Sequence, residues 1–228
     1  MLGRHQTSAG MRALVVSLLV VAACQTAPQQ SRRPAPTRAG TPAAAPAVAP
    51  AAAPAGSVLL DPTRPDVTPA AVEARVHRRT NAARRSRSIP AVATDAALAA
   101  VARRHSADMA ARDFFAHVTP DGLDPNARAA RRGLDCRADV SPTETRVGFL
   151  ENLYQGGLYR SATTTTLGTT TRTVYDWLTD DAIAATTVDG WLGSPGHRRN
   201  LLDGRMAREG IGVAFAPDGR VFVTQMLC

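Results

Sequence analysis

Three short motifs carry side chains that could do chemistry, and each stands among apolar residues. They are Phe114-Phe115-Ala116-His117, Glu151-Asn152-Leu153 and Ser194-Pro195-Gly196-His197. Together they supply two imidazoles and one carboxylate, a set that can bind a divalent metal or transfer protons. The motifs lie far apart in the sequence, so only the fold can bring His117, Glu151 and His197 together.

A divalent metal such as zinc would suit His117, Glu151 and His197, with open positions left for water. Glu151 would then be a ligand or a general base. Each residue also has a structural alternative. His117 could be a histidine at the edge of the core, bonded to backbone, and His197 could hold a neighbouring loop. Glu151 is expected to be buried on a strand, where it needs a partner, either an arginine or the amides of the 194–202 helix.

Ser194 and Asn152 flank these candidate ligands and have expected supporting roles. Ser194 is predicted to cap a short helix, with Pro195 in its first turn and His197 at its third position. The positive end of a helix disfavours an imidazolium, which would keep His197 neutral. A capping hydroxyl is engaged with backbone amides, so Ser194 is not expected to act as a nucleophile. Asn152 is expected to hold backbone.

Helices come first along the chain, and strands follow with helices between them. The patterns predict helices over 68–85, from a cap at Thr94 through Met109, over 126–132, over 179–192 and from Ser194 to about 203. They predict strands over 149–155, 211–216 and 221–227, the last two joined by a turn at 217–220. This order favours an α+β fold with a sheet covered by helices on both faces.

Other polar residues of the predicted helices are assigned structural roles. His105 lies on the apolar face of the second helix and is predicted to be a core histidine. Asp108 and Ser106 are expected to face the other way, where they would cap or pair with Arg112. Arg84 is expected to form a structural salt bridge.

The N-terminal part of the chain reads as an export signal and a tether. Residues 1–24 place a basic residue before a short apolar run, too short to span a bilayer, and Met11 is an alternative start. The run ends in Val21-Ala22-Ala23-Cys24, which resembles the lipobox of bacterial lipoproteins. That resemblance implies cleavage before Cys24 and lipidation of its sulfur, and Gln25 resembles the outer-membrane sorting state. Residues 25–64 are rich in Ala and Pro and read as a tether, so the folded domain is expected over 65–228.

The net charge of +8 comes entirely from arginine, because the chain has no lysine. The arginines are scattered along the domain in short doublets, and no nucleic-acid motif accompanies them. A nucleic-acid partner is therefore not expected.

Cys136 and Cys228 remain once Cys24 is assigned to lipid. In an exported chain they are predicted to form a disulfide that pins the C-terminus to the middle of the domain, and the alternative is two free buried thiols. A closed loop of this size contributes about 4–5 kcal/mol in the chain-entropy view.

The ordered motifs resemble the CAP superfamily of cysteine-rich secretory, antigen 5 and pathogenesis-related proteins, most closely its bacterial branch. The matching pieces are Asn81–Arg84, His105–Met109, Phe114–His117, Asp121-Gly122, Glu151–Leu153, Trp191–Leu201, Gly210–Val213 and Thr224-Gln225. The resemblance implies export and a three-layer α-β-α sandwich. It also implies a shallow cavity lined by two histidines and two glutamates.

Three of the four cavity positions of that family find a match here, in His117, Glu151 and His197. Leu150 replaces the glycine that usually precedes the first glutamate. The second glutamate usually follows a tryptophan by three residues, and that position is Ser194. Asp180, Asp181 or Asp189 could substitute for the missing carboxylate.

These observations favour an exported, lipid-anchored binding or interaction module at the bacterial cell envelope. It is expected to be a monomer on the periplasmic face of the outer membrane or outside the cell. Its ligand would be a lipid or an envelope protein. One alternative is a metal-dependent, protease-like hydrolase using His117, Glu151 and His197, and another is a structural envelope protein. The Thr-rich stretch 161–173 reads as a loop, an insertion or a hairpin, and is the expected specificity element.

Overall fold

The structure is a computed structural model of the chain and describes residues 64–141 and 143–228. The predicted leader, Cys24 and nearly all of the tether lie outside the described residues. The helices are α1 (Pro69–Arg85), α2 (Ala96–Arg112), α3 (Pro125–Ala130), α4 (Asp180–Gly193) and α5 (Pro195–Leu201). The strands are β1 (Ala93–Thr94), β2 (Arg137–Ser141), β3 (Glu144–Val147), β4 (Leu150–Gly157), β5 (Tyr159–Leu167), β6 (Thr170–Trp177), β7 (Arg208–Phe215) and β8 (Arg220–Leu227).

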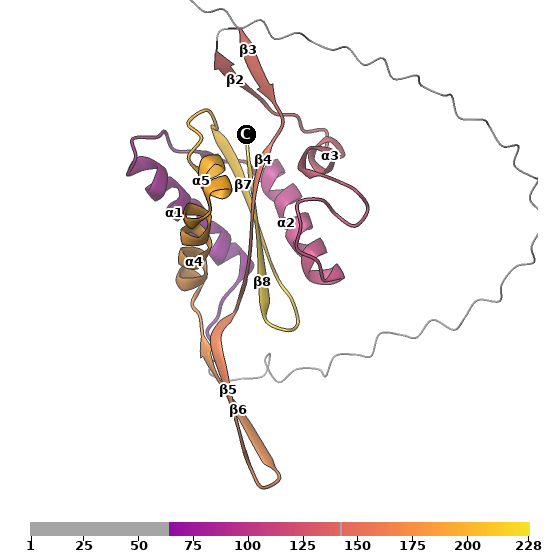
Figure 1. The fold of residues 1–228 in the computed structure, drawn as a ribbon, viewed down its shortest axis with the longest axis vertical. Coiled ribbons are helices and arrows are strands. Elements are labelled where there is room, and N and C mark those ends of the chain that lie inside the picture. The colour runs from indigo at the N-terminus through magenta and orange to yellow at the C-terminus, as the bar shows by residue number, and fades with distance from the viewer. Residues whose placement is uncertain (1–63, 142) are drawn as a thin grey trace, which may run out of the picture. The chain divides into compact units, whose positions relative to one another are not determined.

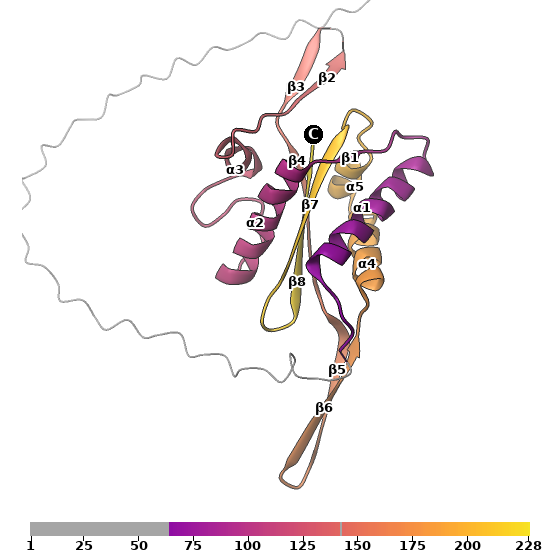
Figure 2. The same ribbon diagram turned by 180° about the vertical axis from the view of Figure 1, so that it is seen from behind.

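A central sheet with strand order β1-β7-β8-β4 organises the domain. The short β1 runs parallel to β7, whereas β7, β8 and β4 are antiparallel to their neighbours. Helices α2 and α3 lie on one side of this sheet, and α1, α4 and α5 lie on the other (Figures 1 and 2). The three-layer α-β-α sandwich expected from the sequence is therefore confirmed.

Each face of the sheet has its own apolar core. Under α1 and α4, Val76, Ile183 and Trp191 are almost completely buried. Under α2, Leu98 and Val101 pack with Met226 of β8. Two hairpins, β2–β3 and β5–β6, are separate two-stranded sheets. The Thr-rich stretch 161–173 therefore forms most of the β5–β6 hairpin.

Two glycines of β7 let α2 come unusually close to the sheet. A Cβ atom on Gly210 would lie 2.1 Å from the backbone nitrogen of Ala99, and one on Gly212 would lie 2.0 Å from that of Arg103. Real Cβ atoms do not approach backbone this closely, so any side chain here would push α2 off the sheet. The Gly210-Ile211-Gly212 motif is thus a packing requirement.

This close approach explains one wrong prediction. Ser106 was expected to face away from the core, but it is fully buried. Its hydroxyl donates to the Gly212 carbonyl at 2.8 Å and lies 2.8 Å from the Thr224 hydroxyl. With glycine on β7, the buried face of α2 is wide enough to include this position. The predicted pairing of Asp108 with Arg112 is confirmed.

Two further local predictions were wrong in their details. The cap of α2 is Asp95, whose carboxylate accepts from the amides of Ala97 and Leu98, while Thr94 belongs to β1. Arg84 has no carboxylate partner among the described residues. It is completely buried and donates instead to four backbone carbonyls, those of Pro90, Leu201, Asp203 and Met206. Carbonyls at the C-terminal end of a helix have no partner within the helix, and those of Leu201 and Asp203, at and just after the end of α5, accept from the guanidinium.

Cys136 and Cys228 form a disulfide in the structure, with Cα atoms 5.6 Å apart across 92 residues of sequence. This is the pairing expected from the sequence. No helix within the described ranges 64–141 and 143–228 is long and apolar enough to cross a bilayer.

Candidate functional site

Glu151 lies on β4, the strand at the open edge of the central sheet. It is directly opposite Met226, so both side chains lie on the sheet face covered by α2. The Glu151 side chain is only 2% exposed. A carboxylate this deeply buried must be compensated by partners of positive charge or by hydrogen-bond donors.

Arg128 is the main partner of this carboxylate. It extends from α3, and its guanidinium forms an ion pair with Oε2 of Glu151. The same guanidinium donates through Nη1 to the carbonyls of His117, at 2.6 Å, and Leu123, at 3.0 Å. Helix α3 is held next to β4 because the amide of Phe149 donates to Oδ1 of Asn126 at 2.8 Å. The arginine therefore joins the 117–123 segment to the edge strand.

His117 is the second partner of Glu151. Its Nδ1 lies 2.9 Å from Oε1 of Glu151, and its ring is half exposed to solvent. The backbone just before it is fixed by His105, whose Nε2 lies 3.0 Å from the Ala116 carbonyl. His105 is buried, as predicted, and burial lowers its pKa, which keeps it neutral. Its Nδ1 has no hydrogen-bond partner in the described part of the chain.

His197 lies on α5, on the opposite sheet face, and its ring approaches that of His117. Its ring centroid lies 6.3 Å from that of His117, with the planes inclined by 58°. Burial lowers the pKa of His197, and the nearby His117 ring lowers it further. The neutral imidazole expected from the sequence is thus supported, with burial as its main cause. Figure 1 shows α3 and α5 on either side of β4, so the edge strand lies between the two contributing elements.

Ser194 does not play the predicted capping role. It occupies the N-cap position of α5, but its side chain makes no cap hydrogen bond. The proline that follows is not the cause, because Thr68 and Asp124 also precede a proline and both cap their helices. The Ser194 hydroxyl is therefore not engaged with backbone amides of α5, so the predicted capping cannot be what keeps it from acting as a nucleophile.

Asn152 supports the site through backbone contacts, as expected. Its Nδ2 donates to the carbonyl of His197 at 3.1 Å and to Oε1 of Gln225 at 2.8 Å. Asn200 of α5 donates in turn to Oδ1 of Asn152, at 3.0 Å, and to the Glu151 carbonyl, at 3.1 Å. These bonds fix α5, and with it His197, against the edge of β4.

The candidate substitutes for the missing carboxylate lie elsewhere. Asp180 pairs with Arg75, and Asp181 pairs with Arg79, both at 2.6 Å, at the N-terminal end of α4. Asp189 is exposed on α4. The site as built therefore consists of His117, Arg128, Glu151 and His197, which we call the edge cluster.

The edge cluster fits a zinc ion poorly in this arrangement. No group of three or more His, Cys, Asp or Glu side chains in the described ranges is placed to hold a metal. Both oxygens of Glu151 are already engaged, one by a permanently charged guanidinium that would repel a cation. Two imidazoles remain, fewer than the three protein ligands of a typical catalytic zinc site. Zinc binding stays a prediction, and it requires Arg128 to release Glu151.

Sequence reasoning missed Arg128 and Asn200. Arg128 is one of many arginines and carries no motif of its own. Asn200 lies within the Trp191–Leu201 motif, so its position in that motif was the available signal. Neither could be paired with Glu151 without knowing that α3 and α5 flank the same strand.

The fold and the edge cluster define a CAP-type α-β-α domain, and the sequence comparisons agree. Residues 77–227 match the sequence profile of the cysteine-rich secretory protein family, CAP. The chain belongs to this family. A search of curated proteins found no match.

Several solved structures resemble this one. An extracellular protein containing an SCP domain from Bacillus anthracis str. Ames is 26% identical, with a TM-score of 0.46, and the match covers 70% of this chain and 40% of that one. An outer surface protein from Borrelia burgdorferi is 13% identical, with a TM-score of 0.46 and coverages of 68% and 90%. A cysteine-rich secretory protein from Staphylococcus aureus subsp. aureus Mu50 is 14% identical, with a TM-score of 0.44 and coverages of 71% and 40%. The chain thus spans two fifths of the Bacillus and Staphylococcus proteins.

Proposed function

We propose that this CAP-domain protein is exported, anchored to the membrane through Cys24, and acts as a binding module at the cell envelope. The apolar leader and the Val21-Ala22-Ala23-Cys24 sequence support export and lipidation. The Cys136–Cys228 disulfide supports an oxidising compartment. The Ala- and Pro-rich stretch after Cys24 would let the domain reach away from the surface.

One observation carries the choice of a binding module over a hydrolase, namely the double pairing of Glu151. A general base needs a free lone pair and a pKa near the working pH. Here Oε2 bears an arginine and Oε1 contacts His117, with the carboxylate shielded from water. The Glu151–Arg128 pair carries no net charge, and burial favours neutral His197. Glu151, Arg128 and His197 of the edge cluster therefore offer hydrogen-bonding groups without net charge, which suits recognition of a polar, uncharged ligand surface.

Membrane anchoring is tested by the substitution Cys24→Ser in the full chain. The wild-type protein is expected in the membrane fraction and to incorporate labelled fatty acid. The Cys24→Ser variant is expected to do neither, while Ser17→Ala in the leader leaves both unchanged. Equal membrane association of the wild type and Cys24→Ser would overturn the anchoring part of the proposal.

The choice between binding and hydrolysis is tested on the purified full chain. Fluorescently labelled casein is incubated with the wild type, with and without added zinc, and with Glu151→Gln. Asp189→Asn serves as the control, because it changes an exposed carboxylate outside the edge cluster. We expect no zinc-dependent cleavage by any of them. Cleavage by the wild type and Asp189→Asn but not by a folded Glu151→Gln would replace the binding module with a metal-dependent hydrolase.

A further inference from the structure

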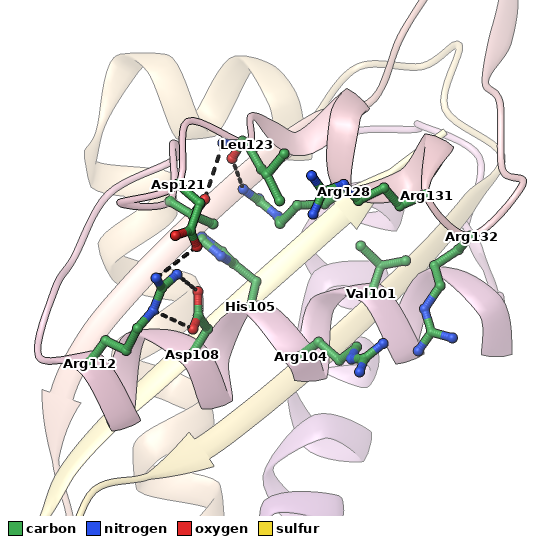
Figure 3. Close-up of a pocket in the computed structure, with 11 residues that line it drawn as sticks. Val101, Arg104, His105, Asp108, Arg112, Asp121, Leu123, Arg128, Arg131 and Arg132 are labelled. Atoms are coloured by element: carbon green, nitrogen blue, oxygen red, sulfur yellow. Dashed lines mark hydrogen bonds and ion pairs between the residues drawn. The ribbon is translucent and has the colours of Figure 1, made fainter.

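A pocket separate from the three site residues predicted from sequence lies between α2 and the segment 119–132. Its volume is about 660 Å³, within the range of small-molecule sites. Figure 3 shows α2 forming one wall and the segment that contains α3 forming the other. His117, Glu151 and His197 do not line it, and Arg128 is the one edge-cluster residue among those that do.

Arginine dominates the lining of this pocket. Five of its lining residues are arginines, namely Arg104, Arg112, Arg128, Arg131 and Arg132. Two of them are already neutralised. Arg112 donates to Asp108 through Nε, at 2.7 Å, and Nη2, at 2.5 Å, and to Asp121 through Nη1 at 2.7 Å. Arg128 pairs with Glu151. Both acidic residues that line the pocket, Asp108 and Asp121, are therefore paired with Arg112, as Figure 3 shows.

Three arginines are left without a counterion. The side chains of Arg104, Arg131 and Arg132 make no hydrogen bond or ion pair with any described residue, and all three residues are exposed. His105 lines the same pocket but stays neutral, because burial lowers its pKa. The pocket therefore has an excess of positive charge that rests on guanidinium groups alone, and their mutual repulsion would be relieved by a bound anion.

Because the unpaired cations of the pocket are all guanidinium groups, they favour some anions over others. A guanidinium presents planar, forked donors that match the oxygens of a phosphate group, and several together can surround one. Val101 and Leu123 also line the pocket, so an organic group attached to the phosphate would meet apolar surface. An inorganic ion would leave much of this volume unfilled.

We propose that this pocket is a binding site for an organic phosphate, held by Arg104, Arg131 and Arg132. The phosphate could belong to a soluble molecule or to the headgroup of an anionic phospholipid, and both present the same chemistry. The site does not depend on the function proposed for the edge cluster, since its three arginines make no hydrogen bond or ion pair with His117, Arg128, Glu151 or His197.

The test uses the full-length protein, and glycerol 3-phosphate and phospholipid vesicles are the probes. Calorimetry measures binding of glycerol 3-phosphate. Sedimentation measures binding to phosphatidylcholine vesicles with and without phosphatidylglycerol. The pocket variant carries Arg104→Gln, Arg131→Gln and Arg132→Gln. The control variant carries Arg78→Gln, Arg85→Gln and Arg172→Gln, which remove the same charge from exposed arginines outside the pocket.

We expect the wild type and the control variant to bind at least one probe, and the pocket variant to bind it about tenfold or more weakly. Binding of glycerol 3-phosphate would assign a soluble phosphate, and binding to phosphatidylglycerol vesicles alone would assign a lipid headgroup. Equal losses in the two variants would show that net charge alone attracts the probe, and would overturn the proposal. Absence of binding to either probe would overturn it as well. Circular dichroism of all variants excludes unfolding as the cause.

Discussion

Two glutamate–histidine pairs of this domain resemble each other in chemistry and differ in surroundings. In the edge cluster, Glu151 contacts His117 at 2.9 Å. Near the opposite edge of the same sheet, Glu209 of β7 contacts His77 of α1 at 2.6 Å. Both carboxylates are almost completely buried, with side-chain exposures of 2% and 0%.

The two histidines are held to different degrees. His77 is three-quarters buried, and its Nε2 also lies 3.3 Å from Nδ2 of Asn81, so both ring nitrogens have protein partners. Asn81 is itself fixed to Val92 through both its oxygen and its nitrogen. His117 is half exposed, and within the described part of the chain its ring makes a hydrogen-bond contact through Nδ1 alone. The first histidine is therefore held by protein groups at both ring nitrogens, whereas the second is held at one.

The two carboxylates are compensated differently as well. Glu209 receives a hydrogen bond from the neutral amide Nε2 of Gln225 at 2.6 Å, whereas Glu151 is paired with the arginine Arg128. Gln225 also accepts from Asn152, which binds the His197 backbone, so a polar chain links both pairs through the core. A buried Glu–His contact alone thus does not mark a functional site, and the free ring nitrogen is what distinguishes the edge cluster.

The largest expected effect comes from removing the disulfide, which supports both pairs. The Cys228 carbonyl accepts from the amides of Ala207 and Arg208, just before Glu209, and the Cys136 carbonyl accepts from Gly148, close to Glu151. Cys136→Ser with Cys228→Ser is expected to lower the free energy of unfolding by about 4–5 kcal/mol. Urea unfolding under non-reducing conditions measures this. An unchanged midpoint, with two free thiols in the wild type, would contradict the pairing.

The second effect separates the scaffold pair from the edge cluster. Glu209→Ala removes the acceptor that lies 2.6 Å from both Gln225 Nε2 and His77 Nδ1, and we expect a loss of about 3 kcal/mol in the free energy of unfolding. Asp189→Ala, at an exposed carboxylate, is the control and should change stability by less than about 0.5 kcal/mol. If the two variants unfolded at the same urea concentration, Glu209 would not be part of the scaffold.

The third effect concerns the charge pair of the edge cluster. Glu151→Gln leaves the Arg128 guanidinium, which is 9% exposed, without its counterion. We expect a loss of about 2 kcal/mol, partly restored when Arg128→Met removes the cation too. A double-mutant cycle measured by urea unfolding gives the coupling between the two residues. Strictly additive losses would mean that Arg128 does not stabilise Glu151.

The smallest effect is a change in the pH dependence of stability. Burial holds the pKa of His197 below its ordinary value, so the unfolded chain takes up this proton at a higher pH than the folded one. The stability contributed by neutral His197 is full above its unfolded pKa and is lost as the pH falls through the folded pKa. His197→Ala should therefore show a smaller decrease in melting temperature than the wild type between about pH 7.5 and 5.5. His105 titrates in the same direction in both proteins, so the difference reports on His197. A larger decrease in the variant would contradict the lowered pKa.

Local patterns accounted for most of the fold. Thr68 and Thr179 cap their helices as their positions suggested, and the turn at 217–220 joins two strands. Local sequence patterns were less reliable where the packing of a helix on the sheet decides which side chains are buried. Ser106 is buried because Gly210 and Gly212 allow α2 to pack closely on the sheet, and Ser194 occupies the N-cap position of α5 without a capping hydrogen bond.

By itself the sequence determined the helices, three of the four strands of the central sheet and the CAP family, because these follow from periodicity, caps, turns and ordered motifs along the chain. The pairing of Cys136 with Cys228 followed from the number of cysteines in a chain expected to be exported. Tertiary structure decided which arginine meets Glu151, which of two histidines keeps a free nitrogen, and which three arginines share a pocket. Those outcomes depend on strand register and on which elements flank one edge of the sheet. The chain has no lysine, so every permanently charged cation is an arginine. Residue type therefore does not show which arginine pairs with a carboxylate, and only distance and burial do.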